Sequence, residues 1–351
     1  MSTEVGLRTQ YLNWREHFPD DLDIEPVWIV IDFWREGGII ERLPIPKNIR
    51  GRIRGYFETS AALNDGPYDA TFIAVHSVLA GRPDYARHHP CYATFDVTPK
   101  QLQAFGDYYG KSASRIPGLE NIKHQGRATS YRQCRLLFPW SNWAASSAVD
   151  DYGAERDRVR ICPPGVDLTR WAPPAAGTRG NGDCRLLFVG GDFERKGGDV
   201  VLEWAKSTRE KHWRLDIVTR KPLKVDDSRI VVHNNLSSND PDLVKLYNQA
   251  DLFVLPTFAD CYSIAGIEAM ASGLPVILGS VGGTPDIIKD GETGYLVPPG
   301  DPSALADRLE RLIGDARLRR SMGDAARADA EERYDVKANI RNTLLMIKES
   351  L

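Results

Sequence analysis

The segment that decides the fold runs Leu252-Phe-Val-Leu-Pro256, then Thr257-Phe-Ala-Asp-Cys-Tyr-Ser-Ile-Ala-Gly-Ile-Glu-Ala-Met-Ala-Ser-Gly-Leu-Pro275. The apolar run at its start predicts a buried strand. A helix is expected to begin near Ser263 and to stop at Gly273, where glycine supplies a left-handed cap and the proline that follows cannot continue the helix. The segment therefore reads as strand, short loop and helix, which is the repeating unit of an α/β fold.

Two acidic residues stand eight positions apart at the mouth of this helix, Asp260 in the loop and Glu268 little more than a turn inside. The first N–H groups of a helix have no partner within it, so the junction is an anion site. Carboxylates beside an anion site indicate a ligand that carries both phosphate and hydroxyl groups.

The same alternation of strands and helices continues on both sides of this segment, which predicts a parallel sheet with helices on both faces. The expected strands are Cys184–Val189, Trp213–Val218, Ile230–His233, Leu252–Leu255 and Pro275–Leu278. The expected helices are Asp199–Ser207, Asp242–Ala250, Ser263–Ser272, Pro302–Ile313, Asp315–Tyr334 and Val336–Glu349.

A chain of 351 residues is longer than a single core usually supports, so two domains are expected. Residues 170–183 are rich in proline and glycine and read as a linker. The division is then an N-terminal α/β domain over 1–169, a C-terminal domain over 184–335 and a final helix over 336–351. In the N-terminal domain, buried strands are expected at Pro26–Ile31, Thr71–Val75, Tyr92–Phe95 and Leu136–Pro139.

Composition excludes several classes of protein. The net charge is −3, from 45 Lys and Arg against 48 Asp and Glu, which gives no electrostatic case for a nucleic-acid partner. The N-terminus lacks the features of a signal peptide, and no apolar run is long enough to span a membrane. The five cysteines are scattered without metal spacing. A cytoplasmic location is expected.

A second strand-to-helix junction reads Leu186-Leu-Phe-Val-Gly-Gly-Asp-Phe-Glu-Arg-Lys-Gly-Gly198. Gly190 and Gly191 let a ligand approach the backbone closely, and Arg195 and Lys196 could clamp a diphosphate. The spacing matches neither GxGxxG nor GxxxxGK[ST]. A solvated turn remains the alternative interpretation of this segment alone.

Taken together, these motifs resemble the retaining glycosyltransferases of family 4, which have the GT-B fold of two Rossmann-like domains facing each other across a cleft. Four segments carry the resemblance: Pro164-Gly-Val-Asp167, Phe188-Val-Gly190 with Lys196-Gly197, the acidic pair with Ala269-Met-Ala-Ser-Gly-Leu-Pro-Val276, and Gly282-Gly283 with Asp290-Gly-Glu-Thr-Gly294. The match covers about residues 141 to 300, and the N-terminal part matches weakly.

The resemblance implies that the second domain holds a nucleotide-sugar donor. Lys196 falls on the family's diphosphate-binding lysine and Glu268 on the glutamate that bonds the ribose. The backbone N–H groups of Ser263, Ile264 and Ala265 fall where the family holds the distal phosphate.

The chain departs from the family pattern at two of these positions. Asp260 stands where the family usually has Glu, and its implied role is to position the sugar hydroxyls as a catalytic residue. Gly191 stands where the family usually has Arg, and we hypothesise that Arg195 supplies the missing charge.

The resemblance also suggests candidates in the first domain. His76, at the end of an apolar strand, is expected to face the donor sugar as a second catalytic residue, with a structural histidine as the alternative. Asn13 and Asp96 are expected on the acceptor side, although Asp96 also reads as a turn or cap residue.

Residues 46–58 form a basic amphipathic pattern, in which Ile49, Ile53 and Phe57 recur at helical spacing beside Arg50 and Arg54. Such a helix can lie on an anionic membrane surface. Peripheral contact with the inner face of the membrane is therefore one hypothesis, and a solvated helix face is the other.

The expected activity is transfer of a hexose from a nucleotide-diphosphate sugar to a hydroxyl of a carbohydrate or lipid-linked acceptor, with retention. No DxD motif follows a suitable strand, so neither a metal nor a cofactor is expected beyond the nucleotide sugar. Two alternatives stay open: a nucleotide-sugar epimerase or hydrolase on the same fold, and a non-catalytic partner. The sequence specifies neither base, sugar, acceptor nor oligomeric state.

Overall fold

The computed structural model describes residues 5–31, 38, 40–42, 44–45, 47–64, 66, 68–74, 85–109, 119–175, 179 and 182–351. The chain divides into two compact units. Unit 1 comprises Met1–Gly106, Lys111–Pro163 and Lys337–Leu351; unit 2 comprises Asp107–Gly110 and Pro164–Val336. The boundary between the units thus lies just before the stretch that reads as a linker, and the last helix belongs with the N-terminal part of the chain.

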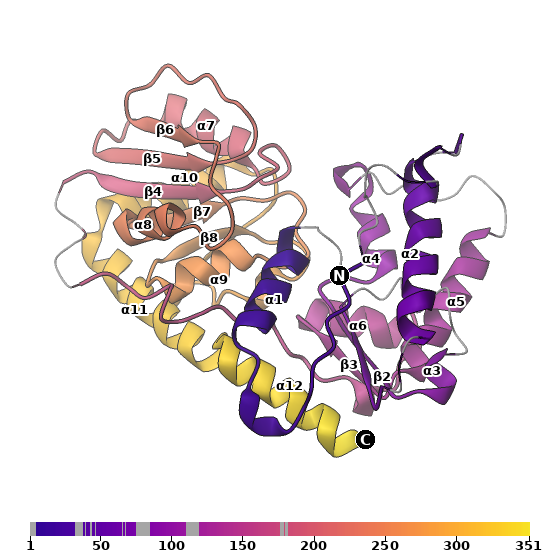
Figure 1. Ribbon diagram of the computed structural model, residues 1–351. Helices are drawn as coiled ribbons and strands as arrows, with labels where there is room; N and C mark the ends of the chain where they lie inside the picture. The colour runs from indigo at the N-terminus through magenta and orange to yellow at the C-terminus, as the bar shows by residue number, and fades with distance from the viewer. Residues whose placement is uncertain are drawn as a thin grey trace. The chain divides into compact units, whose positions relative to one another are not determined.

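Unit 2 is built on a six-stranded sheet in the order β6-β5-β4-β7-β8-β9 (Figure 1). Every neighbouring pair of strands is parallel. The strands are β4 Cys184–Val189, β5 Trp213–Val218, β6 Ile230–His233, β7 Leu252–Leu255, β8 Val276–Gly279 and β9 Gly294–Val297. The helices are α7 Gly198–Ser207, α8 Pro241–Gln249, α9 Ile264–Ala271, α10 Pro302–Gly314 and α11 Ala316–Arg333.

Local sequence explains where these elements begin and end. All residues of β7 and β8 are buried, which matches the continuous apolar runs of a parallel sheet covered on both faces. The side chains of Asp240, Asp301 and Asp315 cap α8, α10 and α11, so each helix starts where its sequence offers a carboxylate to free N–H groups. Gly273, with φ of +71°, terminates α9 as expected.

The helices of unit 2 cover both faces of the sheet (Figure 1). α7 contacts α10, whereas α9 contacts α11. This division follows from the strand order, because β4 leads toward β5 on one side and β7 leads toward β8 on the other. Right-handed crossovers in opposite directions place their helices on opposite faces.

The predicted parallel sheet is confirmed in unit 2. The expected strands appear there within one residue of their predicted bounds, and the expected helices within one residue of theirs. The strand that sequence patterns missed is β9, a short edge strand that contains Gly294 and follows a turn. β9 begins with Gly294 directly after the turn at residues 291–293, and a glycine in that position indicates a continued turn and not a strand.

Unit 1 contains a three-stranded parallel sheet in the order β1-β2-β3. The strands are β1 Thr71–Ile73, β2 Cys91–Phe95 and β3 Leu136–Pro139. The helices are α1 Val5–Glu16, α2 Lys47–Asn64, α3 Tyr85–His88, α4 Pro99–Ala104, α5 Leu119–Gln133, α6 Asn142–Asp150 and α12 Val336–Ser350. Tyr92 Oη on β2 lies 2.8 Å from Ser350 Oγ, which fastens α12 to this sheet.

One predicted strand of unit 1 is wrong. Pro26–Ile31 has no regular secondary structure, and Val27 is 60% exposed. An apolar run alone does not make a strand, because strand formation also requires a neighbour with which to pair its backbone.

None of the helices in the described part of the chain combines the length and apolar character needed to cross a bilayer.

Candidate functional site

The strand order of unit 2 reverses between β4 and β7: the chain continues from β4 toward β5 on one side and from β7 toward β8 on the other. β4 and β7 are neighbours in the sheet although β5 and β6 lie between them in sequence. Open α/β sheets bind ligands just outside the carboxyl ends of such a pair of strands. The two loops that follow these strands are residues 190–197 and 256–263.

Backbone contacts hold these two loops together. The carbonyl oxygen of Arg195 accepts hydrogen bonds from Phe258 N, at 2.9 Å, and from Thr257 Oγ1, at 3.2 Å. Gly197 has φ of +79°, and a Cβ atom there would lie 2.2 Å from the Pro256 carbonyl oxygen. Only glycine allows both this conformation and this approach.

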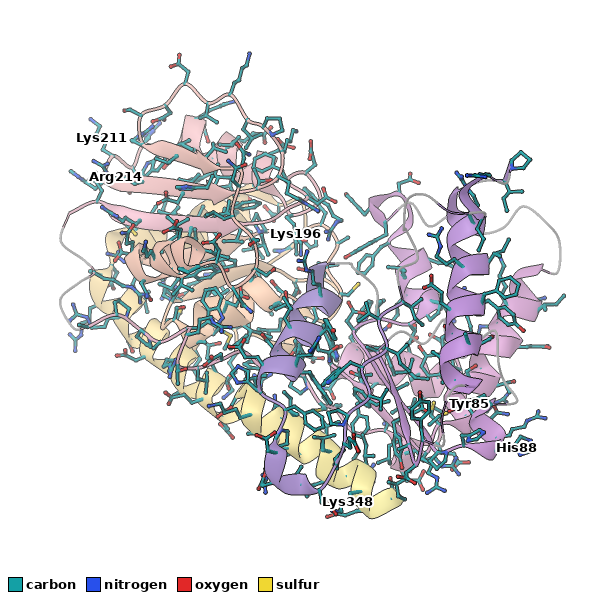
Figure 2. The ribbon with its side chains drawn as sticks, viewed as in Figure 1. Tyr85, His88, Lys196, Lys211, Arg214 and Lys348 are labelled. Carbon is teal, nitrogen blue, oxygen red and sulfur yellow. The ribbon has the colours of Figure 1, made fainter. Side chains whose placement is uncertain are left out.

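Lys196 and Asp260 form an ion pair between the two loops. Lys196 Nζ donates to Asp260 Oδ2 at 2.5 Å, and the two side chains are 15% and 5% exposed. Figure 2 labels Lys196 and shows it at the opposite end of the sheet from Lys211 and Arg214, which lie where β5 begins. The sequence predicted both residues for the site, and the structure brings them into direct contact.

Arg195 is held beside this pair by several acceptors. Its Nε donates to Asp192 Oδ2 at 2.9 Å, and its Nη1 donates to the Ala259 carbonyl oxygen at 2.7 Å and to Tyr109 Oη at 3.1 Å. The guanidinium also lies 4.7 Å from the centre of the Tyr109 ring. Arg195 therefore already neutralises Asp192 and supports the loop that carries Asp260.

The two adjacent glycines of the first loop are each approached by a cationic side chain. A Cβ atom on Gly190 would lie 2.9 Å from Lys196 Cβ, and one on Gly191 would lie 2.9 Å from Arg220 Nε. The absence of side chains at 190 and 191 therefore leaves room for Lys196 and Arg220 to lie against the loop.

The helix after the second loop begins as predicted. Ser263 is the N-cap of α9, and its Oγ accepts a hydrogen bond from Gly266 N at 3.2 Å. Ile264 and Ala265 are partly exposed, whereas the rest of α9 is buried. The first N–H groups of a helix have no acceptor within it, so this end of α9 offers donors to an anion from solvent.

Glu268 is a buried acid. It is 5% exposed and accepts a hydrogen bond from Tyr247 Oη to its Oε2 at 3.2 Å. Burial raises the pKa of Glu268 to about 8, although the hydrogen bond from Tyr247 and the charge of Arg170 oppose this shift. The carboxyl group is therefore mostly protonated at neutral pH and can donate a hydrogen bond as well as accept one.

Two of the three candidate residues in the N-terminal part of the chain, Asn13 and Asp96, lie within the described residues. Asn13 lies on α1 and is buried, next to Trp14, whose ring stacks on that of Phe72 at 4.7 Å. Asp96 directly follows β2 and is partly exposed. Their acceptor-side roles stay predictions, and His76 lies outside the described residues.

The helix predicted over residues 46–58 is present as α2, but its faces differ from the hypothesis. Arg54 is 6% exposed and lies 4.0 Å from Glu58, while Phe57 is 62% exposed. Arg54 therefore lies on the buried face of α2, which it shares with Gly51 because residues three apart on a helix are neighbours. Contact of α2 with a membrane stays a hypothesis.

Three further residues that contact the predicted site residues were not identified from the sequence: Tyr109, Arg220 and Tyr247. Tyr109 is 86 positions from Arg195, and Tyr247 is 21 positions from Glu268. No spacing rule connects residues so far apart. Among the described residues of unit 2 alone, no three His, Cys, Asp or Glu side chains come close enough to hold a metal ion.

Comparison with known proteins agrees with this geometry. Residues 183–315 match the family model "Glycosyl transferases group 1". The chain is 32% identical over 208 residues to a D-inositol 3-phosphate glycosyltransferase of Paenarthrobacter aurescens, covering 53% of this chain and 51% of that protein. It is 25% identical over 230 residues to an MMP alpha-(1->4)-mannosyltransferase of Mycolicibacterium hassiacum, covering 63% and 55%. The chain thus spans about half the length of the curated relatives it matches.

Solved structures share the fold. A sucrose-phosphate synthase from Thermosynechococcus elongatus superposes with a TM-score of 0.69 at 18% identity, covering 90% of this chain and 82% of that one. HepE of Anabaena in complex with UDP gives 0.66 at 14% identity, covering 85% and 82%. The predicted fold class is confirmed as α/β, with the two Rossmann-like domains of the GT-B fold. Residues 183–315 are therefore similar to the glycosyl transferases group 1, and the chain has the GT-B fold.

Proposed function

We propose that this protein is a glycosyltransferase that moves a hexose from a nucleotide-diphosphate sugar to a hydroxyl group of an acceptor, with retention of anomeric configuration. The observation that carries the proposal is the junction of Lys196 with Asp260 beside the open N-terminus of α9. A cation, a carboxylate and free N–H groups at one end of a parallel sheet suit a ligand that combines phosphate with sugar hydroxyls.

In this proposal, the diphosphate binds Lys196 and the first N–H groups of α9. An ammonium group has three donors, so Lys196 can keep its hydrogen bond to Asp260 and still contact a phosphate oxygen. As the anomeric bond stretches, negative charge collects on the leaving diphosphate, and donors that are already in place stabilise it without reorganising.

Asp260 and Glu268 take different parts in binding the donor. Asp260, fixed by Lys196, accepts hydrogen bonds from hydroxyls of the transferred sugar. Glu268, with its raised pKa and its hydrogen bond from Tyr247, binds the hydroxyls of the ribose. His76 is proposed to contact the sugar from the N-terminal domain, and Asn13 and Asp96 to line the acceptor side.

The charge that neutralises the leaving group comes in this proposal from the protein, so neither a metal nor a further cofactor is required. The nucleotide sugar is a co-substrate, and the acceptor is a carbohydrate or a lipid-linked hydroxyl. A cytoplasmic location, with peripheral contact through residues 46–58, belongs to the same proposal. HepE, whose structure contains UDP, and the two curated relatives, which are named as a glycosyltransferase and a mannosyltransferase, support this class of activity.

Binding and turnover together test the proposal. Thermal unfolding in the presence of UDP, GDP, ADP, CDP or TDP should single out one base, because a ligand specific for the folded state raises the apparent stability by mass action. The matching nucleotide sugars are then incubated with an acceptor panel, with and without EDTA. Transfer that persists in EDTA with the anomeric configuration retained is the expected result. Donor turnover without any acceptor would instead indicate an epimerase or hydrolase, and binding without turnover a non-catalytic protein.

A further inference from the structure

Arg220 lies over the first loop of the site from a neighbouring strand. It follows β5, which ends at Val218 and pairs with β4. A Cβ atom on Gly191 would lie 2.9 Å from Arg220 Nε, 3.2 Å from its Nη2 and 3.4 Å from its Cζ. The guanidinium thus occupies the space that a side chain at 191 would fill.

Three other cations around this loop are each neutralised by a carboxylate. Arg195 pairs with Asp192, Lys196 with Asp260, and Lys221 with Glu194. Arg220 differs from all three. It is exposed, and its guanidinium makes no ion pair or hydrogen bond with any residue in the described part of the chain. Of these four cations at the carboxyl ends of β4 and β5, Arg220 therefore carries the charge that no carboxylate offsets.

The adjacent glycines Gly190 and Gly191 are covered by the side chains of Lys196 and Arg220. Lys196 lies against Gly190 and Arg220 lies against Gly191, and consecutive Cα atoms are about 3.8 Å apart. The Cβ and Cγ atoms of Lys196 and the guanidinium of Arg220 therefore cover one step of glycine backbone. Lys196 is a point charge shared with Asp260, whereas a guanidinium offers a planar pair of donors that fits two phosphate oxygens.

From this geometry we infer that Arg220 binds the diphosphate of the nucleotide sugar, in the position that a side chain at residue 191 would otherwise reach. The inference rests on the proposed function. It also explains why residue 191 is a glycine: the absence of a side chain leaves the volume that the guanidinium of Arg220 occupies. Arg195, whose Nε and Nη1 are held by Asp192 and the Ala259 carbonyl oxygen, then supports the loop.

Calorimetric titration of the full chain tests the inference, with the nucleoside diphosphate that the wild-type protein binds and with the corresponding nucleoside. Arg220→Ala should weaken binding of the diphosphate by about tenfold, as expected for loss of a hydrogen bond to a charged group at an exposed site. Binding of the nucleoside should not change. Lys224→Ala, which removes an exposed cation from the same loop, is the matched control and should bind both ligands as the wild type does.

A rescue variant makes the test independent of folding. Gly191→Arg combined with Arg220→Ala places a guanidinium in the same volume from the other strand, and it should recover most of the lost affinity. A double variant as weak as Arg220→Ala would overturn the inference, as would unchanged binding of the diphosphate by Arg220→Ala. If the wild-type protein bound none of the nucleoside diphosphates, the proposed function would fail, and the inference with it.

Discussion

Asp260 and Glu268 lie on the same segment of unit 2, yet their surroundings are opposite. Asp260 is joined to Lys196 at 2.5 Å, so its negative charge is compensated. Glu268 has Tyr247 as a hydrogen-bond donor, and burial raises its pKa to about 8. Asp260 pairs with a cation from the loop after β4, whereas burial favours the neutral form of Glu268. The type of side chain does not decide its chemistry; the groups that fold around it do.

The largest expected effect comes from removing the cation that distinguishes the two carboxylates. Lys196→Ala leaves Asp260 buried without a counter-charge, which should lower the free energy of unfolding by about 3 to 5 kcal/mol. The rate of sugar transfer should fall by about 100-fold or more, because a donor to the leaving diphosphate is lost. Urea denaturation and steady-state transfer assays measure the two effects.

A double variant separates the structural part of this effect from the functional part. Lys196→Met with Asp260→Asn removes both charges, so much of the lost stability should return while transfer stays slow. The control is Lys245→Ala, which breaks an exposed pair with Asp242 and should change stability by less than about 1 kcal/mol. Full transfer activity in the double variant would contradict the assigned role of Lys196.

The second prediction concerns the protonated state of Glu268. Its pKa rises from an ordinary value of 4.5 to about 8 in the folded protein, so the folded state binds more protons between these values. The contribution of Glu268 to stability is therefore greatest below about pH 4.5 and is lost as the pH rises through about 8. The loss over this range is on the order of 3 to 5 kcal/mol.

Glu268→Gln isolates this contribution, because an amide of the same shape does not titrate. Its stability should match the wild type near pH 5 and exceed it near pH 9, in denaturation curves measured across that range. Glu292→Gln, at an exposed glutamate of the same unit, should keep the wild-type slope. Equal slopes for the wild type and Glu268→Gln would show that Glu268 is ionised in the folded protein.

The third prediction concerns Gly197, which lies against the Pro256 carbonyl oxygen where the two loops of the site meet. Gly197→Ala has two costs: alanine must adopt a left-handed φ of +79°, and its Cβ would lie 2.2 Å from the Pro256 carbonyl oxygen. Gly291 has φ of +81° with no atom within 4 Å, so Gly291→Ala carries the conformational strain alone. We expect about 1 kcal/mol of destabilisation for Gly291→Ala and about 2 to 3 kcal/mol for Gly197→Ala. Chemical denaturation of both variants measures the difference. Equal losses of stability would show that the loop around Gly197 shifts to relieve the contact with Pro256.

The smallest effect is expected for Tyr109→Phe. This change removes the hydroxyl that accepts from Arg195 Nη1 at 3.1 Å but keeps the ring beside the guanidinium. Arg195 retains Asp192 and the Ala259 carbonyl oxygen, so stability should fall by about 1 kcal/mol or less. Donor affinity should be nearly unchanged in a calorimetric titration. A loss of affinity larger than tenfold would place Tyr109 in the binding site itself.

The two units differ in how well their sequences predict their structures. In unit 2 the apolar runs of the strands and the helix caps are clear enough that local patterns locate nearly all elements within one residue. In unit 1, β1 has three residues, and the apolar run Pro26–Ile31 forms no strand at all. Short strands depend on pairing with distant neighbours, which no window of sequence contains.

The sequence by itself determined the parallel sheet of unit 2, the start of α9 at its serine cap, and the candidacy of Lys196, Asp260 and Glu268. These follow from local periodicity, capping and motif spacing, which act over a few residues. Only the tertiary structure decided that Lys196 pairs with Asp260, that Glu268 is buried against Tyr247, and that Arg220 lies over Gly191. Ion pairing, burial and steric fit depend on which strands become neighbours in the sheet, and that order is set by packing of the whole unit.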